Sequence, residues 1–226
     1  MAKEKEFKKQ DENLENVGEA LNTTGQWIEE HSNMLTWILI VIVAVVLGIM
    51  AVINYVIKPK TIEAGEEIAK AVVYFQAGDW TKALNGDEED CLGFEAIAND
   101  YKMYQAGELA AAYAGICSYK LGDYESAADF LNRFSADDKM VSPAVLQMLG
   151  DTYVQLDELD KAAKAFYRAA ESGNEWIAPM SLKKLGFVEM ERGNKEAAVK
   201  AFTTIKTGYP TSQEAQDADK YIELNK

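Results

Sequence analysis

Imidazole and thiol groups are scarce in this sequence. Its one histidine is His31, and its two cysteines are Cys91 and Cys117. Catalytic triads and histidine-ligated zinc sites need imidazole next to their other groups, yet a long apolar run separates His31 from most of the chain. Two cysteines without C-x-x-C spacing make neither a disulfide framework nor a thiolate metal site. We therefore expect no enzyme of these classes.

Other signatures of chemistry are missing as well. The sequence has no glycine-rich phosphate loop, no nucleophile elbow and no pair of acids in the pattern of a catalytic cleft. The acidic run at residues 87–90 lacks the ligand spacing of a calcium loop, so we expect it to be a solvated insertion. The sequence thus predicts no catalytic residue, no metal and no cofactor.

Positive charge is outweighed by negative charge. Lys and Arg number 23 against 37 Asp and Glu, which gives a formal net charge of −14. A surface of that sign repels the phosphate backbone, so nucleic acid is not an expected partner.

Proline is rare, whereas the helix formers Ala, Leu, Glu and Lys are plentiful. This composition favours an all-α fold. We expect the four prolines to lie at element boundaries, where their missing N–H is tolerated: Pro59, Pro143, Pro179 and Pro210.

One apolar run is long enough to cross a membrane. The 23 residues from Leu35 to Ile57 carry no charge and would span about 34 Å as a helix. Trp37 and Tyr55 lie near its ends, as is typical of membrane interfaces, and Lys-Pro-Lys follows directly. A cleaved signal would be shorter and closer to the start, so we expect the helix to stay attached. The run divides the chain into a tail (1–34), a span (35–57) and a repeat domain (58–226).

Two signals for the orientation of this span conflict. Residues 14–34 contain no Lys or Arg, whereas three lysines follow the span: Lys58, Lys60 and Lys70. By the positive-inside rule this pattern places the N-terminus outside. A lysine cluster in the far tail indicates the opposite: Lys3, Lys5, Lys8 and Lys9. Charge alone leaves the orientation open.

The tail has an amphipathic pattern between Asp11 and Ser32. Its apolar residues recur at heptad-like spacing, with acids on the other face: Leu14, Val17, Leu21 and Ile28. We expect a helix here. A solvated lead into the span and a docking helix for a partner are equally compatible with the pattern.

After the span, the sequence repeats itself. Gly115, Gly150 and Gly186 lie 35 and 36 residues apart, and an alanine follows each by twelve: Ala127, Ala162 and Ala198. This period is close to the roughly 34 residues of the tetratricopeptide repeat, and the chain resembles that family. The resemblance implies helical hairpins in which glycine and alanine let two helices approach closely. A larger residue four positions after each alanine is expected to fill the hairpin: Leu131, Phe166 and Phe202.

Irregular copies flank these three repeats. A degenerate repeat is expected at Ala71 to Ala83, with its second helix delayed by residues 85–94 and resumed at Phe94. From Ser212 onward we expect a cap helix, with a capping box at Thr211 and Glu214 and one apolar face: Ala215, Ala218 and Ile222. The predicted fold is therefore all-α: a single N-terminal transmembrane helix, then a tetratricopeptide-type α-solenoid, then a C-terminal cap helix.

The family resemblance also implies a partner-binding groove. First helices line it at five motif positions, which correspond here to Leu109, Ala112, Ile116, Tyr119, Lys120, Ala144, Gln147, Asp151, Val154, Gln155, Met180, Lys183, Phe187, Met190 and Glu191. Such a mixed, methionine-containing surface suits unfolded or extended polypeptide segments. Packing against the cap or a neighbouring repeat is an equally weighted alternative for each of these residues.

The whole arrangement is similar to bacterial membrane-anchored repeat proteins, a group that includes the ancillary subunit of the SecYEG translocon. The similarity includes the segments AGELAAAYAG and LGDYESAADFL. It implies a cytoplasmic tail, an inner-membrane span and periplasmic repeats. It also implies protein binding in translocation or envelope protein biogenesis, with translocon subunits or periplasmic chaperones as partners. The alternative hypothesis is a structural subunit of a larger envelope complex.

Overall fold

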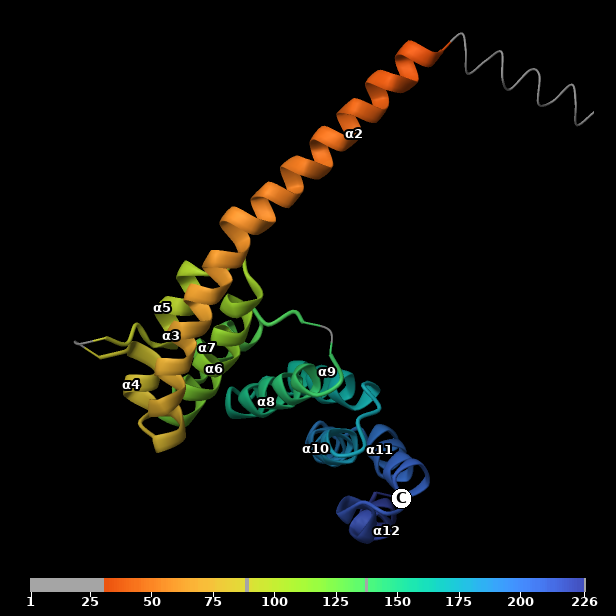
Figure 1. The fold of residues 1–226 in the computed structure, drawn as a ribbon. Coiled ribbons are helices and arrows are strands. Elements are labelled where there is room, and N and C mark those ends of the chain that lie inside the picture. Colours follow the sequence, from red (N-terminus) through yellow and green to blue (C-terminus); the bar gives the residue numbers. More distant parts are fainter. Residues whose placement is uncertain (1–30, 88–89, 137, 226) are drawn as a thin grey trace, which may run out of the picture. The chain divides into compact units, whose positions relative to one another are not determined.

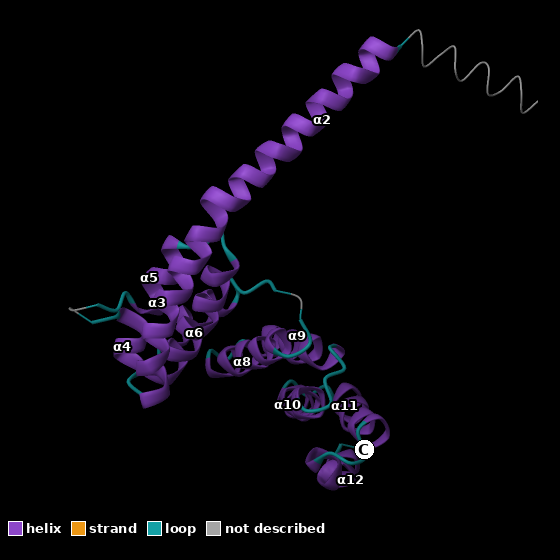
Figure 2. Ribbon diagram, in the orientation of Figure 1, coloured by secondary structure: helices purple, strands orange, loops and turns teal. Residues whose placement is uncertain are grey.

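The computed structural model describes residues 31–87, 90–136 and 138–225. The chain forms two compact units, residues 1–58 and 59–226. The described residues form helices and no strands, which confirms the all-α prediction (Figure 2).

In the first unit, the apolar run is helical throughout. Helix α2 (Ser32–Val52) is followed by a π-helical segment, η1 (Ile53–Ile57). Of the described residues, this helix near the N-terminus is the one that is long and apolar enough to cross a membrane, by length and composition. A helix satisfies its own backbone hydrogen bonds, which is what a lipid environment demands. The amphipathic helix predicted between Asp11 and Ser32 lies outside the described residues, apart from its last two.

The second unit is a series of helices joined by turns and loops (Figure 1). In chain order they are α3 (Lys58–Ala77), α4 (Trp80–Asn85), α5 (Gly93–Asp100), α6 (Gln105–Leu121), α7 (Tyr124–Leu131), α8 (Val141–Gln155), α9 (Leu159–Glu171), α10 (Ile177–Glu191), α11 (Lys195–Gly208), the 3-10 helix η2 (Gln213–Asp217) and α12 (Ala218–Leu224).

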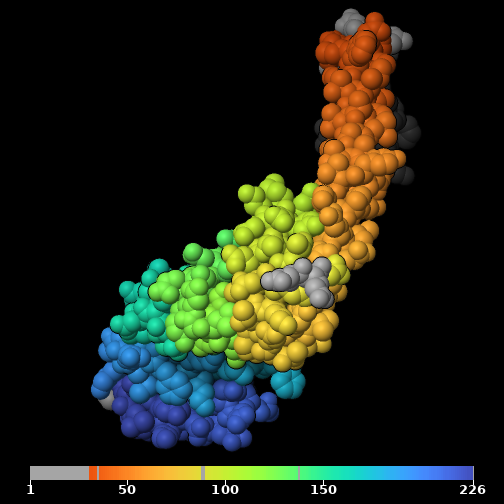
Figure 3. All heavy atoms as spheres, turned by 90° about the vertical axis from the view of Figure 1, so that its left-hand side faces the viewer, coloured from red at the N-terminus to blue at the C-terminus, as the bar shows by residue number. Residues whose placement is uncertain are grey.

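The three regular repeats are the pairs α6/α7, α8/α9 and α10/α11. Within this unit the sequence colours follow one another in order in Figure 3, as they do when each helix packs mainly against its neighbours along the chain. This is the packing of an α-solenoid. Pro143 and Pro179 lie in the first three residues of α8 and α10, and Pro210 lies just after α11, as predicted. Pro59 differs, because it lies inside a continuous helical stretch from Ser32 to Ala77.

In each repeat, a glycine in the first helix lets the second helix pack closely against it. A Cβ built on Gly150 would lie only 2.5 Å from Cε1 of Phe166, so alanine does not fit there. The ring occupies the space that the missing side chain leaves. The same contact, sixteen residues apart, recurs in all three repeats: Gly115 with Leu131, Gly150 with Phe166, and Gly186 with Phe202.

The turns inside the hairpins share one backbone conformation. Gly122 and Gly193 have φ of 84° and 74°, a region that suits glycine. In the middle repeat Asp157 holds this position with φ 58°. Asp123 and Asn194 then cap the second helices by accepting backbone N–H bonds at 3.0 and 3.4 Å.

The degenerate repeat has a second helix split in two, α4 and α5. The split falls at the predicted insertion, and α5 begins at Gly93, one residue before the predicted position. Asp87 accepts backbone N–H bonds from Asp90 and Cys91 at 2.9 and 3.0 Å, which closes the insertion at its base.

The cap differs from the prediction at its start. Ser212, not Thr211, is the N-cap, because its hydroxyl accepts the N–H of Ala215 at 3.3 Å. The first turn is a 3-10 helix, and α12 begins at Ala218. Ala218 is fully buried against the last repeat, so the predicted apolar face is confirmed at its centre.

Candidate protein-binding surface

We use the name first-helix face for the groove residues predicted on α6, α8 and α10. Two polar contacts join α8 to α10 along it. Gln147 Nε2 donates to Ser181 Oγ at 3.1 Å. Lys184 Nζ lies 2.8 and 2.6 Å from the carboxylate oxygens of Asp151. Gln147 and Asp151 are therefore already paired, and they align neighbouring repeats.

Their partners Ser181 and Lys184 are not among the predicted groove residues. They follow Gln147 and Asp151 by 34 and 33 residues, about one repeat period. A search for complementary polar residues one period apart would have found both.

The prediction that Ala112 lines the groove is wrong. It is 4% exposed and belongs to a buried cluster with Val145 and Leu149 of the next first helix. A small residue at this position lets α6 and α8 approach, and it offers no surface to a ligand.

The C-terminal end of the first-helix face is partly covered by the cap. The Phe187 ring packs edge-on against Tyr221, with centroids 4.9 Å apart, and lies 5.7 Å from Phe202. Met190 packs against the same buried cluster, and Lys183 pairs with Asp217 at 3.7 Å. These residues stabilise the cap, and Phe187 keeps 38% of its surface exposed.

The rest of the predicted groove is exposed or half-buried. Leu109 and Met180 are 37% and 43% exposed. Together with half-buried Ile116, they lie outside the buried clusters of the described chain. The remaining predicted residues with exposed or half-buried side chains are Tyr119, Lys120, Ala144, Val154, Gln155 and Glu191.

Tyr119 supplies a hydrogen-bond donor on this face. Burial, and after it the nearby Asp151 carboxylate, raises the pKa of the Tyr119 hydroxyl. Its ring packs edge-on against Tyr124 with centroids 5.3 Å apart. The hydroxyl therefore stays protonated at neutral pH.

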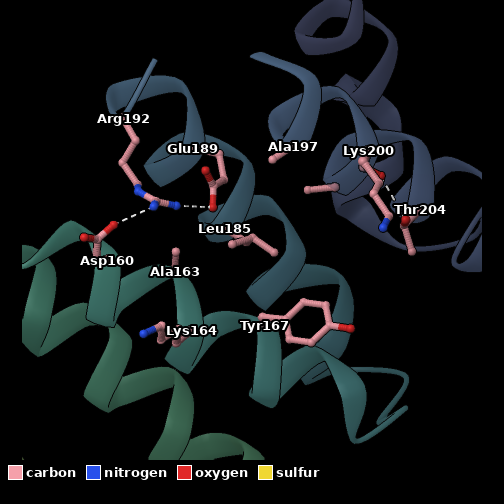
Figure 4. A pocket seen from close by; sticks show the side chains of 11 residues that line it. Asp160, Ala163, Lys164, Tyr167, Leu185, Glu189, Arg192, Ala197, Lys200 and Thr204 are labelled. Carbon is pink, nitrogen blue, oxygen red and sulfur yellow. Dashed lines mark hydrogen bonds and ion pairs between the residues drawn. The ribbon is translucent and has the colours of Figure 1, made fainter. Parts of the chain in front are cut away.

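A hollow lies between α9, α10 and α11 (Figure 4). It encloses about 340 Å³. Arg192 bridges two acids above it, at 2.6 Å from Glu189 and 2.5 Å from Asp160. Its lining mixes small apolar and charged side chains: Asp160, Ala163, Lys164, Tyr167, Leu185, Glu189, Arg192, Ala197, Lys200, Ala201 and Thr204.

Charged groups of this hollow pair with one another. Its acids are engaged by Arg192, and it contains neither thiol nor imidazole. Glu189 Oε2 is buried without a hydrogen-bond partner among the described residues, and solvent does not reach it. This hollow was not predictable from the repeat motif, because Asp160 and Arg192 occupy no motif position.

The cysteines are free and buried. Burial raises the pKa of Cys117 to about 12, so its thiol is unreactive at physiological pH. Across residues 31–87, 90–136 and 138–225, no cluster of His, Cys, Asp and Glu is arranged to hold a metal ion.

One comparison with known proteins bears on this geometry. Residues 143–172 match the tetratricopeptide repeat family model. The match runs from the first turn of α8 to the end of α9, and so covers the hairpin closed by Gly150 and Phe166. No curated protein matches the chain. The α8/α9 hairpin is thus a tetratricopeptide-type repeat by both sequence and packing.

Proposed function

We propose that this chain is a membrane-anchored scaffold that binds other proteins through the first-helix face. The observation that carries the proposal is a set of exposed or half-buried apolar side chains on two of the three first helices, α6 and α10: Leu109, Ile116 and Met180. Exposed apolar residues at matching positions of a repeat suit a partner that extends along the array.

The preferred partner is an extended or unfolded polypeptide segment. Methionine and leucine adapt their shape to different apolar side chains. The charged side chains Asp151 and Lys184 pair with each other, so this pair does not offer a single fixed charge for a charged tail to recognise. Tyr119 and Gln155 supply hydrogen bonds to a partner backbone. This chemistry favours apolar side-chain contacts over recognition of one terminal group.

We place the anchor in the inner membrane and the repeats in the periplasm. The apolar helix α2 supports the anchor, and the similarity to membrane-anchored bacterial repeat proteins supports the orientation. A role in protein translocation or envelope protein biogenesis follows, with translocon subunits, secretory polypeptides or periplasmic chaperones as partners. Protease added to spheroplasts should digest the repeats. Protection until lysis would reverse the orientation.

A photo-crosslinking residue at Leu109 tests the function in cells. Leu109 is exposed and packs in no buried cluster of the described chain, so the substitution leaves the fold intact. We expect capture of translocon subunits, secretory polypeptides or periplasmic chaperones. Capture of none of these, with the same crosslinker active at Trp176, would contradict the proposal.

The second candidate function is a structural subunit of a larger envelope complex. The hollow between α9 and α11 favours it, because it gives the repeats a second surface with a defined shape. A stoichiometric complex that survives purification in mild detergent would support this candidate. Transient and heterogeneous partners would support the first.

A further inference from the structure

The four-residue turn between α5 and α6 presents an unusual surface. Tyr101 is 6% exposed and belongs to the buried cluster, and Tyr104 packs against the same cluster. Between them, Lys102 is exposed and Met103 is 84% exposed. The turn thus directs its two aromatic rings inward and a lysine and a methionine outward.

This exposure belongs to a well-defined turn. The N–H of Tyr104 donates to the carbonyl of Tyr101 at 2.9 Å, and the N–H of Gly107 donates to the carbonyl of Tyr104 at 2.9 Å. A Cβ on Gly107 would lie 2.1 Å from the Tyr101 oxygen, so α6 starts against the turn only because this residue is glycine. The backbone therefore fixes where Met103 is displayed.

The turn packs against the very start of the repeat unit. Lys60 Nζ lies 5.7 Å from the centre of the Tyr101 ring and 2.8 Å from Glu63. Hydrogen bonds from Lys60, and after it from the Tyr101 hydroxyl, lower the pKa of Glu63. Tyr101 is thereby tied to the first turn of α3.

Chain connectivity then places this turn close to the bilayer. Lys60 follows Ile57, the last residue of the apolar run, by three residues. Three residues reach at most roughly 11 Å, whatever path they take. The headgroup layer on each side of the hydrocarbon core is about 5–8 Å deep. Lys60 therefore lies no more than roughly 11 Å from the end of the apolar run, a distance of the order of the headgroup layer, and the 101–104 turn contacts α3 at this residue.

The chemistry exposed there fits a lipid surface. Ile62, two residues after Lys60 in α3, is 63% exposed, so two large apolar side chains accompany Lys60 and Lys102. Apolar side chains gain free energy at the boundary between headgroups and acyl chains, and lysine reaches lipid phosphates.

We propose that the 101–104 turn and Ile62 form a second membrane contact, with Met103 and Ile62 inserted among the lipid headgroups and Lys102 beside their phosphates. The inference rests on the proposed membrane anchoring. Its consequence is that the first repeat is held at the bilayer surface, while the later repeats remain available to partners.

Three positions of equal exposure allow a matched test. Tyr55, Met103 and Trp176 are each 84% exposed. Each is replaced by cysteine in the full chain, labelled with an environment-sensitive fluorophore and reconstituted in nanodiscs of phosphatidylcholine and phosphatidylglycerol. The native Cys91 and Cys117 are buried, so the label attaches to the new thiol. Lipids with a nitroxide near the headgroup then quench any fluorophore that contacts lipid.

We expect several-fold stronger quenching for Tyr55→Cys and Met103→Cys than for Trp176→Cys, with blue-shifted emission at both. Quenching at position 55 with none at 103 would overturn the second contact and leave the anchor intact. No quenching at position 55 would contradict the anchoring itself. A label at 103 shielded from both nitroxide lipid and aqueous iodide would show a protein partner there, and equal quenching at 103 and 176 would exclude a local contact. Either result would overturn the inference.

Discussion

Glycine inside a helix usually costs about 1 kcal/mol relative to alanine, yet at Gly150 the structure requires it. The Phe166 ring is 1% exposed and occupies the space next to this glycine. Gly150→Ala should therefore destabilise the chain by about 1–2 kcal/mol, because overpacking outweighs the gain in helix propensity. Thermal melting in mild detergent, followed by circular dichroism, measures the effect.

Gly65→Ala is the matched control for this substitution. Gly65 also lies within a helix, but a Cβ there would meet no atom within 4 Å. The control should melt at the same temperature or higher. If Gly150→Ala melted like the control, the packing described for the hairpin would be wrong.

Asp157 offers the opposite case, a residue that glycine should improve. It has φ 58° where the first and third repeats have glycine. A side chain in this left-handed region costs roughly 1 kcal/mol, although Asp tolerates it better than most residues. Asp157→Gly should raise the free energy of unfolding by up to about 1 kcal/mol, measured by urea denaturation. A lower urea midpoint for Asp157→Gly would mean that the Asp157 carboxylate stabilises the fold by more than its backbone strain destabilises it.

At the scale of elements, the cap is held by aromatic packing. The Tyr221 ring stacks on Phe202 with centroids 5.0 Å apart and contacts Phe187. Tyr221→Ala should lower the free energy of unfolding by about 2–3 kcal/mol, because it exposes the rings of Phe187 and Phe202 to solvent. In a solenoid such damage stays local. Amide hydrogen exchange should therefore accelerate in α10 and α11, with α3 to α5 unchanged.

Tyr167→Ala, which removes an exposed tyrosine from α9, is the control for this prediction and should change stability by less than about 0.5 kcal/mol. Uniform acceleration of exchange across the whole repeat unit would contradict a locally attached cap.

The hairpins were predictable from sequence, because their packing depends on one small and one large residue at a fixed spacing. Gly150 and Phe166 are such a pair, and they are in contact in the structure. The groove was less predictable. Ala112 is buried because α8 lies against it, and Phe187 is partly covered because Tyr221 lies over it. Both outcomes depend on how one repeat meets the next element, which a motif within one repeat does not specify.

At the scale of the whole molecule, the proposed function combines an apolar N-terminal helix with repeats that expose apolar side chains on α6 and α10. The alternatives place binding on the hollow between α9 and α11 or on the loops. Ile116 and Met180 represent the first-helix face, and Tyr167 and Trp176 represent the other surfaces. Paired substitutions on each therefore separate the two accounts.

The most direct test measures how the full chain in nanodiscs binds a permanently unfolded polypeptide, such as reduced and carboxymethylated α-lactalbumin, by fluorescence anisotropy. We expect Ile116→Ser with Met180→Ser to weaken binding about tenfold, or about 1.4 kcal/mol, at unchanged helix content. Tyr167→Ser with Trp176→Ser should bind as the unmodified protein does. Absence of binding by the unmodified protein, or weakening confined to the Tyr167 and Trp176 pair, would contradict binding through the first-helix face.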